Sequence, residues 1–74
     1  MTQDEANLKK VKDHWQKVAI EVIEIEHIGA AYYAFGSELA TLRLYRHYAP
    51  NKKIHQDYSE NRQCFYFRLE MLVM

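Results

Sequence analysis

The side chains of this chain that are best suited to chemistry are tyrosines and arginines, and the chemistry they suit is binding. Five of them lie between residues 32 and 68 of the 74-residue sequence: Tyr32, Arg43, Tyr45, Tyr66 and Arg68. Aromatic rings and guanidinium groups form the strongly binding centres of protein interfaces. On an open sheet they can also stack unpaired bases and neutralise phosphates, or simply cover the strands where these meet solvent.

The charge balance favours a protein partner over a nucleic acid. The chain has ten basic and ten acidic residues, so its formal net charge is zero. Residues 1–30 carry four lysines against six acids, whereas residues 31–74 carry six basic residues against four acids. Proteins that bind nucleic acid or anionic membranes without specificity need an excess of positive charge. We therefore expect a protein partner, with single-stranded nucleic acid as the alternative ligand of the same face.

The histidines and the lone cysteine do not have the spacing of a metal site. They are His14, His27, His47, His55 and Cys64. Local zinc sites use patterns such as C-x-x-C or H-x-x-x-H, which bring two ligands together on one element. The strand register described below instead pairs His47 with Glu26, as charged cross-strand neighbours do. The sequence thus predicts no metal site and no cofactor.

A catalytic motif is also absent from the sequence. A small nuclease needs a proton acceptor, a proton donor and a cationic group for the phosphate, and residues of those types are His47, His55, Arg43, Arg62 and Tyr58. Their spacing does not select them as a set, and the chain has neither a nucleophile motif nor a glycine-rich phosphate loop. We predict a protein that is not an enzyme and has no catalytic residues.

The N-terminal segment predicts an amphipathic helix. Apolar residues recur at spacings of three and four, which places them on one helix face: Leu8, Val11, Trp15, Val18 and Val22. Thr2 and Glu5 have the spacing of a capping box. The helix is expected over residues 3–20, because the β-branched residues that follow favour a strand. The alternative extends the helix to His27.

The remaining chain predicts three strands. Gly36-Ser37 resembles a two-residue hairpin turn with glycine in the first position, which joins strands over residues 22–35 and 38–48. If Phe35 faces Glu38, then Tyr32, Arg43 and Tyr45 share the outward face. Residues 50–61 are polar and predict a loop. Residues 62–72 form the third strand, whose alternation turns Tyr66 and Arg68 outward and Phe67 inward.

These elements predict an α+β fold in one domain, residues 1–74, with the helix packed on a three-stranded antiparallel meander (α-β-β-β). One sheet face stays uncovered, and the last strand has an exposed edge that can pair with another chain. We expect a small regulatory or inhibitor-type protein that forms a homodimer and binds a larger protein. A single cysteine, an acidic N-terminus and the lack of a long apolar run predict a cytoplasmic protein without membrane contact.

Overall fold

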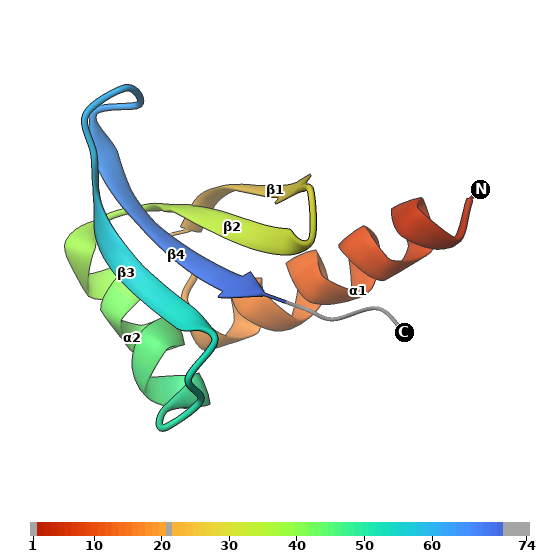
Figure 1. The fold of residues 1–74 in the computed structure, drawn as a ribbon, viewed down its shortest axis with the longest axis horizontal. Coiled ribbons are helices and arrows are strands. Elements are labelled where there is room, and N and C mark those ends of the chain that lie inside the picture. Colours follow the sequence, from red (N-terminus) through yellow and green to blue (C-terminus); the bar gives the residue numbers. More distant parts are fainter. Residues whose placement is uncertain (1, 21, 71–74) are drawn as a thin grey trace.

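The computed structural model describes residues 2–20 and 22–70. Within these residues the chain forms two helices and a four-stranded antiparallel sheet (Figure 1). The elements in chain order are α1 (Gln3–Val18), β1 (Val22–Ile28), β2 (Ala31–Gly36), α2 (Glu38–Tyr48), β3 (Ile54–Ser59) and β4 (Cys64–Glu70). The strand order across the sheet is β1-β2-β4-β3. The α+β class and the N-terminal helix are confirmed, whereas the three-stranded meander is wrong.

Helix α1 begins as its sequence predicts and ends slightly earlier. The Thr2 hydroxyl accepts a hydrogen bond from the Glu5 backbone N–H at 3.2 Å, which satisfies one of the free donors of the first turn. The helix ends at Val18, and Ala19 adopts an extended conformation. The predicted end at Ile20 is two residues too late. The alternative that continued the helix to His27 is wrong, because those β-branched residues form β1.

The predicted strand 22–35 is in fact the hairpin of β1 and β2. Gly29 and Ala30 form the two-residue loop between Ile28 and Ala31, which pair with each other. Gly29 has a φ of 61°, a conformation that a residue without Cβ adopts at little cost. The chain therefore has a two-residue turn with glycine in the first position, as predicted, but the glycine is Gly29 and not Gly36.

The predicted strand 38–48 is helix α2. The Ser37 hydroxyl accepts a hydrogen bond from the Ala40 backbone N–H at 3.1 Å and caps the helix. Ala40, Thr41 and Leu44 are buried, a spacing that lies on one helix face. Apolar residues at 40, 42 and 44 also fit a strand, so the capping serine is the feature that separates the two structures. The predicted pairing of this segment with residues 26–35 therefore does not exist.

The C-terminal part contains one more strand than predicted. Residues 54–59 of the expected loop form β3, and the predicted strand 62–72 is β4, with residues 71 and 72 lying outside the described residues. Strand β4 pairs with β2 on one side and with β3 on the other. The prediction that the last strand has a free edge is wrong. The outer strands of the described sheet are β1 and β3.

Both helices pack on the same sheet face and enclose the core with it (Figure 1). Trp15 of α1 lies at the centre, fully buried, with its ring edge-on to Phe67 of β4 at a centroid distance of 5.3 Å. Its indole N–H donates to the Tyr48 hydroxyl of α2 at 2.7 Å. Trp15 belongs to the predicted apolar stripe and packs against the sheet as that stripe predicts, and this hydrogen bond ties the two helices together.

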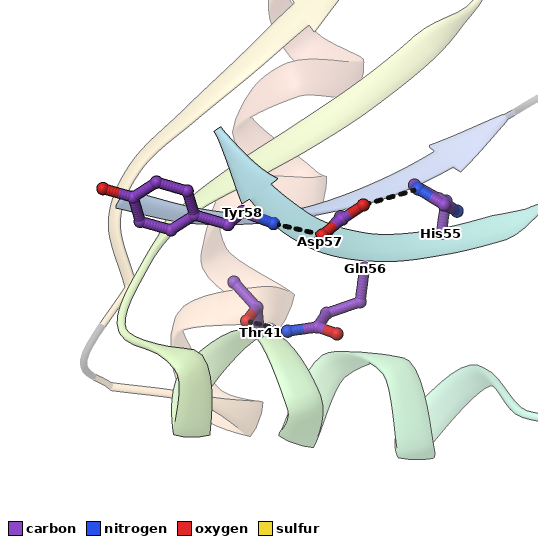
Figure 2. A network of polar contacts seen from close by, with 5 residues as sticks. All are labelled: Thr41, His55, Gln56, Asp57 and Tyr58. Carbon is purple, nitrogen blue, oxygen red and sulfur yellow. Dashed lines mark hydrogen bonds and ion pairs between the residues drawn. The ribbon is translucent and has the colours of Figure 1, made fainter. Parts of the chain in front are cut away.

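A second polar tie joins α2 to the sheet. Thr41 is fully buried, and its hydroxyl accepts a hydrogen bond from the Gln56 side-chain amide at 3.1 Å (Figure 2). The same hydroxyl lies 3.1 Å from the Ser37 carbonyl oxygen and 3.0 Å from that of Glu38, to which it donates. Gln56 therefore reaches inward from β3 to a helix position that is otherwise apolar.

Thr41→Val should destabilise the fold by about 1–2 kcal/mol, because the half-buried Gln56 amide loses its acceptor while the side-chain shape is kept. Urea unfolding followed by circular dichroism measures this loss. The double variant Thr41→Val/Gln56→Met should recover most of it, since both polar groups are then gone. Thr41→Ser, which keeps the hydroxyl, is the control. A double variant whose loss equals the sum of the two single losses would show that the hydrogen bond contributes nothing.

Candidate binding face of the sheet

The sheet face turned away from the helices carries two rows of polar and aromatic side chains. Directly paired residues on neighbouring strands lie on the same face. The first row, from β1 to β3, is Glu24, Phe35, Tyr66 and Asp57. The second row is Glu26, Tyr33, Arg68 and His55. We call these eight residues, together with Arg62 from the turn between β3 and β4, the outer face.

Aromatic rings occupy the middle of the outer face. The rings of Tyr33 and Phe35 are nearly parallel, with an interplanar angle of 6° and centroids 5.9 Å apart. Tyr66 lies 6.0 Å from Tyr33 on one side and 5.8 Å from the His55 ring on the other. The rings therefore form one continuous strip across β2, β4 and β3, a surface on which a flat or apolar group can rest.

Arg62 closes one side of this strip. Its guanidinium carbon lies 4.1 Å from the centre of the Phe35 ring, within the range of a cation–π contact. The same guanidinium group forms ion pairs with Glu24, at 3.6 Å, and with Glu26. Phe35 is only 6% exposed. Arg62 thus covers an aromatic ring on the open face and has its charge balanced by two carboxylates.

Arg68 lies in the second row, between Tyr33 and His55, and has a different environment. Its side chain is half-buried, and its Nε has no hydrogen-bond partner among the described residues and no contact with solvent. Burying such a donor without an acceptor costs free energy, more so when the group is charged. Glu26, the carboxylate at the β1 end of this row, forms its ion pair with Arg62. On the outer face, Arg62 is therefore paired with two carboxylates, whereas the Nε of Arg68 has no acceptor among the described residues.

Comparisons with protein-family models, curated proteins and solved structures found no match to this chain. Chemical capability must therefore be argued from the side chains themselves. Among the described residues, His, Cys, Asp and Glu do not come together in groups of three or more that can hold a metal ion. None of the described helices is long and apolar enough to cross a membrane.

The structure brings together two of the five predicted binding residues. Tyr66 and Arg68 both lie on the outer face, as their alternation along β4 predicts. Arg43 and Tyr45 belong to α2 instead, on the other side of the sheet. Tyr32 is 3% exposed and faces the core, where its ring stacks on His27 at 4.4 Å. The predicted five-residue face is therefore not one surface.

The hairpin explains why Tyr33, and not Tyr32, lies on the outer face. A continuous strand from 22 to 35 keeps all odd-numbered residues on one side. The two-residue loop at Gly29 and Ala30 pairs Ile28 with Ala31, so the residues that face the core change from odd numbers in β1 to even numbers in β2. Recognition of the glycine turn would have placed Tyr33 and Phe35 outward.

The residues considered for a nuclease do not share a surface. His47 and Arg43 belong to α2, whereas His55 lies on the outer face and is 3.9 Å from Asp57 (Figure 2). The predicted contact of His47 with Glu26 is also absent, because a helix replaces the strand; His47 meets His14. The sequence indicates Arg62 and His55 only as residue types suited to a nuclease, and it predicts a loop in place of β3, so it does not place either residue on the sheet face.

Proposed function

We propose that this chain is a small, non-enzymatic interaction protein that binds and modulates a larger protein through the outer face. The observation that carries the proposal is Arg68, a half-buried cation whose Nε has no acceptor among the described residues and which lies beside the half-buried rings of Tyr33 and Tyr66. A carboxylate of a partner that pairs with this half-buried guanidinium group would add charge-assisted hydrogen bonds and offset the cost of burying the donor. The regulatory, inhibitor-type role is part of this proposal, because a small protein that covers a surface of its partner can change what that surface does.

The composition of the outer face fits a protein partner. Tyrosine and arginine are enriched at the centres of protein interfaces, and a polar rim surrounds such centres. Here Tyr33, Tyr66 and Arg68 occupy the middle, while the more exposed Glu24 and Asp57 lie on the outer strands. The partner surface that fits is one with an apolar or aromatic side chain for the strip of rings and a carboxylate for Arg68.

A single-stranded nucleic acid is the second candidate, because the strip of rings can stack bases. The charges on the outer face argue against it. Glu24, Glu26 and Asp57 lie on that face beside the rings, and Arg62 is already paired with two of them. A phosphate backbone that follows the strip would meet these carboxylates. The protein partner is therefore preferred, and nucleic acid becomes an outcome of the test.

Affinity capture with the untagged chain coupled to a resin tests the proposal. Tyr66→Ala and Arg68→Ala should each weaken retention of the partner roughly tenfold or more, as removal of central interface residues does. Tyr45→Ala and Arg46→Ala are the matched controls, because they remove the same residue types from the exposed side of α2. The partner is then purified and its affinity for each variant is measured by calorimetry.

Two results would overturn the proposal. One is a partner whose retention depends on Tyr45 or Arg46 and not on the outer-face residues. The other is salt-sensitive binding of a short single-stranded RNA mixture that Tyr66→Ala abolishes, which would establish the nucleic-acid alternative. Light scattering after size exclusion, run on the same variants, tests the predicted homodimer separately. A dimer that Tyr66→Ala separates would mean that the outer face binds a second copy of this chain.

A further inference from the structure

A pair of histidines joins the exposed surfaces of the two helices. His14 of α1 and His47 of α2 are 33 positions apart in the sequence, yet their Nε2 atoms are 3.2 Å apart. Their ring centroids are 5.2 Å apart, and the planes are tilted by 57°. Both residues are exposed. This contact lies on the helical side of the molecule and has no part in the outer face.

The core holds this pair in place. The next residue on each helix is a member of the buried tie, because Trp15 follows His14 and Tyr48 follows His47. The indole-to-hydroxyl hydrogen bond of that tie, 2.7 Å long, fixes the separation of α1 and α2 at this point. The His47 ring also lies edge-on against Tyr48, with a centroid distance of 5.0 Å and an angle of 88°. The two imidazoles are therefore positioned before any ligand arrives.

We propose that His14 and His47 form a two-histidine site for a divalent transition-metal ion of the zinc class. Zinc binds imidazole nitrogen at 2.0–2.1 Å, and two such ligands in a tetrahedral site are about 3.4 Å apart. The observed separation of 3.2 Å nearly matches that distance. In the metal-free protein the two neutral rings can share one N–H···N hydrogen bond. On binding, the ring that donates this hydrogen bond carries its proton on Nδ1 instead, both Nε2 lone pairs coordinate the metal, and water completes the coordination.

The nitrogen ligands, together with the charges around the pair, set the selectivity of the site. One helical turn from His14 lie Lys10 and Lys17, and one turn from His47 lies Arg43. These positive charges repel a hard cation such as Mg²⁺ or Ca²⁺. Such a cation prefers oxygen ligands, and the two imidazoles offer only nitrogen. A borderline metal gains its affinity from the nitrogen lone pairs. Protons compete for the same lone pairs, so binding should weaken as the pH falls from neutral.

Zinc titration of the untagged protein tests the site, with calorimetry for affinity and histidine-ring NMR signals for location. His14→Ala and His47→Ala should each lower the zinc affinity at least tenfold. His55→Ala should leave the affinity unchanged, because it removes an exposed histidine from the opposite side of the sheet. Zinc should also raise the thermal midpoint of the wild type and of His55→Ala, since it links α1 to α2 in the folded state alone.

The outcomes that contradict the site are equally specific. Equal zinc affinity in wild type, His14→Ala and His47→Ala would show that the ion binds elsewhere. No shift of the two ring signals with zinc in excess would exclude the site altogether. Equal affinity for Mg²⁺ would show a general cation surface. Circular dichroism of each variant confirms that the fold is kept, which is expected because both side chains are exposed.

Discussion

Trp15→Ala is expected to destabilise this protein by about 3–5 kcal/mol. Trp15 is fully buried, and its ring packs against one ring on each of three elements: Tyr32 of β2, Tyr48 of α2 and Phe67 of β4. The total stability of a domain of this length is about 4–11 kcal/mol, so the loss is a large share of it. Urea unfolding monitored by circular dichroism gives the change in free energy.

Two further variants separate packing from hydrogen bonding at this position. Trp15→Phe keeps a ring in the core but loses the indole N–H that Tyr48 accepts, and it should cost less than the alanine variant. Ile20→Ala is the surface control, because Ile20 is 79% exposed and its loss should change stability by less than about 0.5 kcal/mol. If Trp15→Ala costs no more than Ile20→Ala, Trp15 does not hold the helices on the sheet.

The parts of the fold that the sequence predicts well are those that local signals determine. Helix α1 has an apolar stripe with a consistent period and a threonine cap, and both signals indicate the same structure. The central part of β4 alternates without interruption, so the outward direction of Tyr66 and Arg68 follows from the sequence. Of the five predicted binding residues, these two lie on the outer face.

The parts that were mispredicted are those where two local signals compete. Residues 38–48 have apolar side chains at positions that fit a strand as well as a helix. The Ser37 cap and the hydrogen bond between Gln56 and Thr41 favour the helix. The direction of Tyr32 and Tyr33 depends on which glycine makes the turn, because a two-residue loop reverses the side that each residue number faces. With the turn placed at Gly36 instead of Gly29, the sequence interpretation puts Tyr32 on the surface, although it lies in the core.

Contacts across long sequence separations were beyond any local signal. His14 and His47 belong to elements that meet only when both helices cover the sheet, so a search for closely spaced ligands could not find them. Arg62 covers Phe35 because β3 and β4 form a hairpin whose turn reaches β2. Both contacts depend on the strand order β1-β2-β4-β3, which pairing preferences of single strands do not determine.

Neighbouring residues of β4 should separate stability from binding. Phe67→Ala is expected to cost about 3–5 kcal/mol, because Phe67 is fully buried and its ring packs against Trp15 at 5.3 Å and Tyr48 at 5.7 Å. Tyr66→Ala lies one position earlier on the opposite face. It should cost about 1 kcal/mol or less, since it loses only cross-strand contacts with Tyr33 and His55. Both losses are measured by urea unfolding.

The binding assay should rank variants at the same two positions in the reverse order of their stabilities. Here Phe67→Leu replaces the alanine variant, because it removes less of the core, and at a temperature where it is folded it should retain the partner at nearly wild-type strength, since the outer face is intact. Tyr66→Ala should remain folded and lose retention, because one ring of the strip on the outer face is missing. If the partner instead dissociates in step with stability across all variants, its binding reports the folded fraction and not the outer face. A clean separation would assign the two faces of one central strand to different tasks, one to the core and one to recognition.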